Sequence, residues 1–274
     1  MTEWLTTPAA QAGVVPFIVA LLSAALLRKA GWYWAGGALV AGFAVAVYLS
    51  VGFQFQPWTS TRKIVALILG AAAVGLLYDL YPYQRRWLIP ITAAAAIAAV
   101  WWVVWPVLSR SAGLEFWLLA AGISVYTAWC AVMMDALRAK PVALSGAAVA
   151  LGFGAGITAL LGASALLGQW GIALGVSAGA LWLFVTFTRN TAIGSLAALP
   201  LGAGAALIGC AAAVYAKLPW TSLAILALIP LAARLFWFPR LPRLAQAALS
   251  MLVTAALAAA AVWFTLQRTG APPL

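Results

Sequence analysis

The sequence of 274 residues contains no histidine, only two cysteines and only four acidic residues. Without histidine the chain lacks the commonest haem ligand, the commonest metal ligand and the commonest general base. The two cysteines, Cys130 and Cys210, stand inside apolar stretches and match neither a metal-binding spacing nor a CxxC motif. We therefore expect no cofactor and no metal. We also expect no enzyme, because no catalytic constellation is recognisable.

Charged residues are scarce as well, at 7% of the chain against about 25% in a typical soluble domain, while hydrophobic residues make up 66%. A water-soluble exterior cannot be built from that composition, whereas a bilayer solvates apolar side chains directly. No stretch is both polar and long enough to form a soluble domain. The sequence therefore predicts a single integral membrane domain over residues 1–274, with the lipid bilayer as its principal partner.

The net charge of +11 does not indicate a protein that binds nucleic acid. The 15 basic residues occur in small groups between apolar segments, and none of the groups is long enough to follow a phosphate backbone. Such scattered cations are typical of membrane orientation signals and of contacts with anionic headgroups. We therefore expect no nucleic acid partner and leave other membrane subunits open as partners.

Ten apolar stretches, most of about 20 residues, predict ten transmembrane helices, because lipid requires each backbone amide to find a partner within its own segment. Their continuous apolar character excludes the alternating pattern of a β-barrel. The predicted fold class is an all-α polytopic membrane protein. Its least regular segment is 143–166, which is rich in glycine and alanine and could bend or re-enter. The predicted helices cover residues 12–27, 33–53, 62–81, 87–108, 115–137, 143–166, 170–188, 192–215, 220–238 and 243–266.

The distribution of basic residues predicts the orientation of these helices. With the N-terminus outside, the alternation of helices places ten Lys and Arg residues on the cytoplasmic side and five on the outer side. The positive-inside rule therefore favours both termini outside, in a bacterial inner or plasma membrane. The cytoplasmic set is Arg28, Lys29, Arg85, Arg86, Arg138, Lys140, Arg189, Arg234, Arg240 and Arg243, and the outer set is Arg62, Lys63, Arg110, Lys217 and Arg268.

Two parts of the chain resemble each other at a constant offset of 162 residues. Residues 57–60 and 219–222 both read Pro-Trp-Thr-Ser, and the ungapped segments 57–102 and 219–264 share 15 of 46 positions. Six of these identities are alanine, which matches by chance in apolar helices, but chance explains the motif and the shared offset less well. An offset of six helices predicts a parallel repeat: helices one to four (1–111) correspond to helices seven to ten (168–274), with two linking helices at 112–167. Parallel repeats occur in transporters.

The first candidate site is the predicted outer start of the third helix. Thr59, Ser60, Arg62 and Lys63 bring hydroxyl groups, free backbone N–H groups and two cations to a helix N-terminus, an arrangement that attracts anions or headgroups. The same residues also fit an ordinary helix start, where proline and hydroxyl residues are favoured. The equivalent residues of the second repeat are Thr221 and Ser222, with Ala224 and Ile225 in place of the cations.

The second candidate is an ion pair within the membrane. Arg234 lies about one turn inside the end of its predicted helix, and an unpaired charge in hydrocarbon costs several kcal/mol. We expect Arg234 either to extend to the interface or to pair with Asp79 or Asp135. All four acids lie near predicted helix ends, which disfavours a proton carrier driven by a carboxylate at mid-membrane.

Glycines recur at four-residue spacing in two predicted helices, as Gly152 and Gly156 and as Gly171, Gly175 and Gly179. Small residues on one helix face allow two helices in a membrane to approach closely. We expect close packing inside the bundle, with a subunit interface as the alternative.

These features favour a small carrier or permease for a small molecule, anionic or amphipathic, that the sequence does not identify. The repeat and the number of helices support the carrier. The scarcity of polar residues at mid-membrane supports a first alternative, a non-catalytic subunit or scaffold of a larger membrane complex. A second alternative is a lipid-modifying membrane enzyme. A cavity between the halves would favour the carrier, and stoichiometric partner subunits would favour the scaffold.

Overall fold

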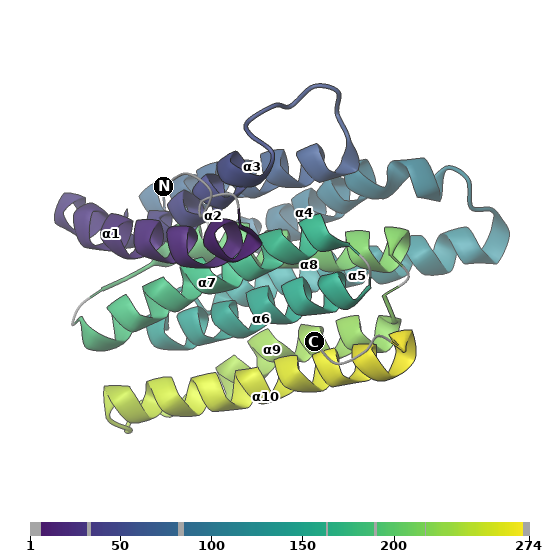
Figure 1. Cartoon of the computed structure of the whole chain (residues 1–274). Coiled ribbons are helices and arrows are strands. Elements are labelled where there is room, and N and C mark those ends of the chain that lie inside the picture. The colour runs from purple at the N-terminus through teal and green to yellow at the C-terminus, as the bar shows by residue number, and fades with distance from the viewer. Residues whose placement is uncertain are drawn as a thin grey trace.

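The computed structural model describes residues 7–31, 34–81, 85–162, 164–188, 191–216 and 218–270. These residues form ten α-helices and no strand, which confirms the predicted all-α polytopic class (Figure 1). A π-helical segment (Ala10–Val14) leads into the first helix, and a 3-10 turn (Trp34–Gly36) leads into the second. The helices are α1 (Val15–Ala30), α2 (Gly37–Ser50), α3 (Ser60–Leu80), α4 (Arg85–Leu108), α5 (Gly113–Ala136), α6 (Pro141–Leu161), α7 (Ala165–Phe187), α8 (Gly194–Tyr215), α9 (Trp220–Leu235) and α10 (Arg243–Thr269).

Eight helical segments of the described residues are long and apolar enough to cross a membrane, where α1 is counted together with the π-helical segment before it as Ala10–Lys29. The other two, α2 and α9, have only 14 and 16 residues. A helix of 16 residues is about 24 Å long, which is shorter than the roughly 30 Å of hydrocarbon in a bilayer. The predicted segments 33–53 and 220–238 therefore overestimate both helices. Helix α2 ends just before Gly52, whose positive φ turns the chain, and α9 ends shortly before Pro239.

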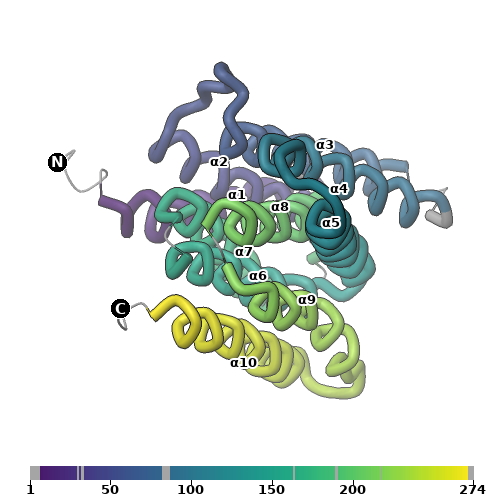
Figure 2. The backbone as a smooth tube through the Cα atoms, turned by 90° about the vertical axis from the view of Figure 1, so that its right-hand side faces the viewer, coloured from purple at the N-terminus to yellow at the C-terminus, as the bar shows by residue number. Residues whose placement is uncertain are grey.

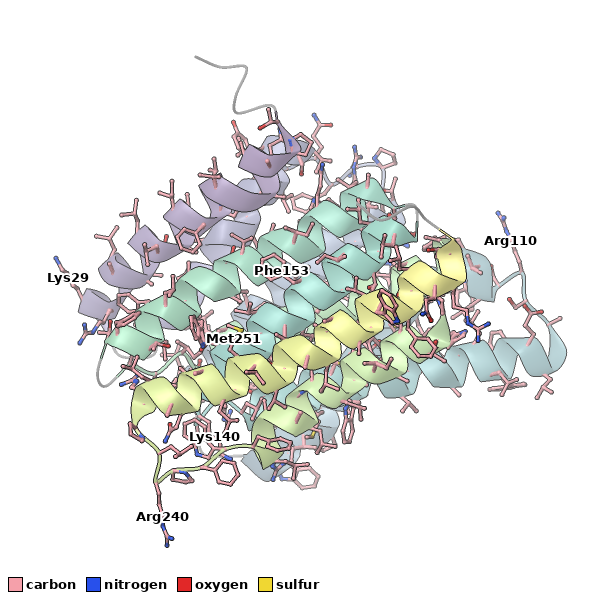
Figure 3. All side chains as sticks on the ribbon, turned by 60° about the horizontal axis from the view of Figure 1, so that its bottom comes forward. Lys29, Arg110, Lys140, Phe153, Arg240 and Met251 are labelled. Carbon is pink, nitrogen blue, oxygen red and sulfur yellow. The ribbon has the colours of Figure 1, made fainter. Side chains whose placement is uncertain are left out.

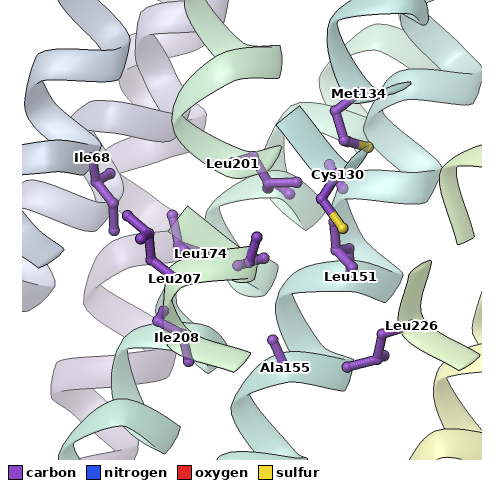
Figure 4. Packing of buried hydrophobic residues seen from close by; sticks show 14 of the residues in the cluster. Ile68, Cys130, Met134, Leu151, Ala155, Leu174, Leu201, Leu207, Ile208 and Leu226 are labelled. Atoms are coloured by element: carbon purple, nitrogen blue, oxygen red, sulfur yellow. The ribbon is translucent and has the colours of Figure 1, made fainter. Parts of the chain in front are cut away.

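The glycine- and alanine-rich segment predicted at 143–166 is continuous helix only as far as Leu161, where α6 ends, and residues 165–166 already belong to α7. Helices α6 and α8 are the most deeply buried of the candidate membrane spans. Figure 2 shows α9 and α10 along one side of the bundle and α2, α3 and α4 along the opposite side. The hydrophobic core contains side chains from all ten helices. Figure 4 shows part of it, including Ile68, Cys130, Leu151, Leu174, Leu201 and Leu226. Both cysteines are buried and free, as expected.

Helices α6 and α7 approach each other at the predicted glycines. A Cβ added at Gly152 would lie 2.5 Å from the backbone nitrogen of Gly175, and one added at Gly171 would lie 2.4 Å from Cα of Gly156. Such distances leave no room for a side chain, so these positions require glycine. The expected close packing inside the bundle is confirmed at these four residues. A Cβ added at Gly179, by contrast, would meet nothing within 4 Å.

Successive helices alternate in direction, so the bundle has two ends. We call the end where α3 begins the Ser60 end, and the end where α3 finishes the Asp79 end. Helix α1 begins and α10 finishes at the Ser60 end. Figure 3 shows Lys29, Lys140 and Arg240 toward the Asp79 end and Arg110 at the opposite end, in line with the two predicted charge sets. Arg189 and Lys217 of those sets lie outside the described residues. Which end faces the cytoplasm stays a prediction.

Candidate functional site

A cavity of about 310 Å³ lies between α3, α4, α5 and α8. Small residues leave this space open: Gly70, Ala95 and Ala99 line it, and a Cβ added at Gly70 would meet nothing within 4 Å. Tyr78 and Thr92 are the polar side chains of the lining, and the Thr92 hydroxyl lies 3.3 Å from the Tyr78 hydroxyl, to which it donates. The cavity therefore offers an apolar surface with one pair of hydroxyl groups.

A cluster of polar contacts joins α3, α4 and α8 at the Ser60 end. The Ser60 hydroxyl lies 3.0 Å from the carbonyl oxygen of Val103 and 2.9 Å from the hydroxyl of Tyr215, which donates to the same carbonyl at 3.0 Å. Lys63 Nζ donates to the carbonyl of Trp102 at 3.0 Å and lies 5.2 Å from the centroid of its ring. We call these five residues the Ser60 cluster. They hold one end of α3 against its neighbours.

A second cluster joins α3, α5 and α8 at the Asp79 end. The carboxylate of Asp79 accepts hydrogen bonds from the backbone N–H groups of Ser195 and Leu196, both at 2.9 Å, and so caps the start of α8. The Ser195 hydroxyl donates to Asp135. Arg138 Nη1 lies 2.9 Å from the Ser195 hydroxyl, to which it donates, and 3.6 Å from the Asp135 carboxylate. We call these five residues the Asp79 cluster.

The structure brings together only part of the predicted ion pair. Asp79 and Asp135 meet at Ser195, but their basic neighbour is Arg138 rather than Arg234. Arg138 follows Asp135 by three residues, so the two side chains meet locally at the end of α5. Arg234 is exposed near the end of α9. Its position agrees with the other expectation, that a long side chain near a helix end reaches the interface.

The predicted anion site at the start of α3 is divided between two places. Thr59 caps the helix, with its hydroxyl 3.4 Å from the backbone nitrogen of Arg62, as in an ordinary helix start. Ser60 and Lys63 belong to the Ser60 cluster. Arg62 turns the other way and donates to backbone carbonyls of the preceding loop. The two adjacent cations therefore do not face one shared ligand site.

The repeat-equivalent residues have different environments. Thr221 is exposed, whereas Ser222 is fully buried and accepts a hydrogen bond from the Thr265 hydroxyl at 2.8 Å. Ser222 and Thr265 are 43 residues apart, which is also the separation between Ser60 and Val103. In each segment the serine of the Pro-Trp-Thr-Ser motif thus joins the start of one helix to the end of the next.

The sequence did not predict the cavity or three members of the Asp79 cluster, Arg138, Ser195 and Leu196. It also did not predict Trp102, Val103 and Tyr215 of the Ser60 cluster. Arg138 carried a signal, because an acid and a base three residues apart can meet on a helix. Ser195 carried a weaker one: it follows Gly194, the first residue of α8, and glycine is favoured where the backbone needs a positive φ. The cavity carried none, because its glycine and alanine residues also suit close helix packing.

No protein-family model and no curated protein matches this chain. The assignment of function therefore depends on the cavity and on the two clusters at the ends of α3 and α8.

Proposed function

We propose that this chain is a small membrane carrier for an amphipathic molecule with an apolar body, and that the cavity between α3, α4, α5 and α8 is its binding site. The observation that carries the proposal is the position of this cavity. Helices α3 and α8 both border it, and they are joined at one end through Ser60 and Tyr215 and at the other through Asp79 and Ser195. Carriers open a fixed site alternately to either side. In this proposal the bonds of one cluster break while those of the other stay intact, so that the site opens at one end of the bundle at a time.

The lining of the cavity supports the class of molecule. A free ion or a sugar would lose its hydration and find only the hydroxyls of Tyr78 and Thr92 in return. An alkyl or acyl chain needs no hydrogen bonds and gains contact with the alanine and leucine side chains of the walls. A polar group at one end of the molecule would then meet the hydroxyl pair.

One observation favours a second candidate, the non-catalytic membrane subunit. Two hydroxyl groups are few for a carrier site. A lipid chain or a helix of a partner could occupy the same cavity permanently. The predictions that the chain is not an enzyme and that both termini lie outside are retained as parts of the carrier proposal.

Filling the cavity tests the proposal. Gly70→Leu places an isobutyl group where an added Cβ meets nothing within 4 Å, and Gly179→Leu adds the same group at an equally open position on α7. The probe is a fluorescent lysophospholipid, and the measurement is its protein-dependent movement across proteoliposome membranes. We expect wild type and Gly179→Leu to move it equally fast. Gly70→Leu should lower the rate about tenfold or more, because the filled cavity no longer admits the chain.

Two results would reject the carrier. The first is equal movement by all three proteins. The second is movement no faster than in protein-free liposomes. The non-catalytic subunit would gain support if the protein, gently extracted from its native membrane, also copurifies with partner subunits at fixed stoichiometry.

A further inference from the structure

A second cavity, of about 220 Å³, lies beside α3 beneath the loop of residues 51–59. Its floor consists of buried apolar side chains, Val47, Val65 and Trp170, none of which is more than 3% exposed. Its rim carries the hydroxyl of Thr61 and the guanidinium of Arg62. An apolar floor beneath a cationic rim suits a ligand with an apolar body and one acidic group.

The loop holds Arg62 at this rim. Arg62 Nη1 donates to the backbone carbonyls of Gln56 and Pro57, the latter at 3.1 Å. A guanidinium carries five N–H donors in a planar fork. These two contacts use Nη1 alone, so the donors on Nε and Nη2 have no partner among the described residues. They form the pair of parallel donors that a carboxylate accepts.

Aromatic side chains make up much of the remaining wall. Trp170 is fixed by the bond from its indole nitrogen to the Ser50 hydroxyl at 3.2 Å. Phe55 lines the cavity and packs on Trp58 with ring centroids 6.0 Å apart. The described residues that line this cavity include no Asp or Glu, so no carboxylate among them pairs with Arg62. Flat, rigid walls of this kind favour a flat ring in contact with them.

We propose that this second cavity binds a small aromatic monocarboxylate, with the carboxylate against Arg62 and the ring against Trp170 and Phe55. An inorganic anion would leave the apolar floor uncovered, and a neutral aromatic molecule would leave the donors of Arg62 without an acceptor. The site lies apart from the α3–α4 cavity: Val65 lines one and Ala66 the other, and neighbouring helical residues point about 100° apart. The inference therefore goes beyond the carrier proposal.

The test is isothermal titration calorimetry of the purified full chain in detergent. Benzoate is the probe, benzamide its neutral analogue and inorganic phosphate the simple anion. Arg62→Gln should weaken benzoate binding about 10- to 100-fold, because it removes a charge-assisted pair of hydrogen bonds. It should leave benzamide binding nearly unchanged. Arg110→Gln is the matched control, since it removes the same charge at the same end, where Figure 3 shows Arg110 pointing away from the bundle.

A second variant covers the case in which Arg62→Gln loosens the loop and the fold. Thr61→Val keeps Arg62 and its loop contacts but removes one hydroxyl from the rim, and it should weaken benzoate binding about 2- to 10-fold. The inference fails if benzoate shows no saturable binding, if phosphate or benzamide binds as tightly as benzoate, or if Arg110→Gln matches Arg62→Gln. None of these results involves movement of the lysophospholipid, so they leave the carrier test untouched.

Discussion

The α3–α4 and α9–α10 hairpins begin with the same motif, and the serine of each motif contacts the equivalent position of the following helix. The hydroxyl of Ser60 bonds to the carbonyl of Val103, and the hydroxyl of Ser222 bonds to that of Thr265. Ser222 follows Ser60, and Thr265 follows Val103, by the same offset of 162 residues. The internal repeat stays a prediction, and this shared contact supports it. It also indicates that the serine of the motif holds a hairpin together rather than binding a ligand.

The two hairpins differ in the space around them. Between α3 and α4 the cavity remains open at Gly70. The α9–α10 hairpin packs tightly on α6: a Cβ added at Gly154 would lie 2.5 Å from Leu226 Cδ2 and 3.4 Å from Ala258 Cβ. A hairpin that serves packing alone fills such space, because voids forfeit dispersion contacts. The proposed binding site thus lies beside the hairpin that leaves space next to its helix faces.

The two hairpins also differ in their charged residues. Arg62, Lys63 and Asp79 of the first hairpin correspond to Ala224, Ile225 and Leu241 of the second at the same offset. Charged residues in a membrane domain are costly and concentrate where they serve a purpose. The first hairpin thus carries two cations and an acid that the second hairpin lacks at the equivalent positions. The following substitutions test this contrast.

The largest effect is expected from Asp79→Leu, which gives the first hairpin the residue of the second. The backbone N–H groups of Ser195 and Leu196 lose their acceptor at the start of α8. We expect the free energy of unfolding to fall by about 2 to 4 kcal/mol. Thermal unfolding in detergent measures the change as a lower Tm. Glu115→Gln is the control, because Glu115 is an exposed acid in the first turn of α5, and its Tm should stay at the wild-type value. An unchanged Tm for Asp79→Leu would show that the Asp79 cluster does not stabilise the fold.

The next largest effect is expected when valine replaces a glycine beside each hairpin, and it is measured as a change in unfolding free energy. Gly154→Val must displace Leu226 and should cost about 1 to 3 kcal/mol of unfolding free energy, as overpacking does. Gly70→Val enters open space, and the same thermal measurement should show a change near zero. Equal destabilisation at the two positions would mean that the α3–α4 cavity closes around added atoms, and the contrast between the hairpins would be lost.

The residues show why the fold was predictable and the site only in part. Each helix carries its own signal, a continuous apolar stretch, because the bilayer acts on every segment separately. The clusters depend on contacts between distant segments: Asp79 and Ser195 are 116 residues apart, and Ser60 and Tyr215 are 155 apart. No local sequence pattern predicts contacts between residues so far apart. The residue types at the start of α3 were enough to single out Arg62 as a candidate. Trp170, which lines the same cavity, belongs to α7, and no local pattern in the sequence links it to Arg62.

A smaller effect is expected when the motif serine is removed from each hairpin. Ser222→Ala acts at a fully buried position and should cost about 1 kcal/mol, since Thr265 keeps its bond to the carbonyl of Ala261. Ser60→Ala should cost less, about 0.5 kcal/mol, because Tyr215 still donates to Val103. The Tm of each variant measures the difference. A larger loss at Ser60 would make the Ser60 cluster, rather than the buried pair of the second hairpin, the stronger contact.

Lys63→Gln is expected to change benzoate affinity only slightly, and it separates the two adjacent cations. Lys63 lies against Trp102 in the Ser60 cluster, whereas Arg62 lines the second cavity. Glutamine can still donate to the carbonyl of Trp102, so only the exposed cation–π contact is lost, which is worth about 0.5 to 1 kcal/mol. Benzoate affinity should change by less than about twofold at low ionic strength, through the long-range field of the missing charge. This difference in affinity should vanish as salt is added, because exposed charges are screened.

The loss of benzoate affinity caused by Arg62→Gln should persist in salt, because Arg62 contacts the benzoate carboxylate directly. If Lys63→Gln instead weakens benzoate binding as much as Arg62→Gln at high salt, the two cations act on one anion, as the helix-start motif alone had predicted.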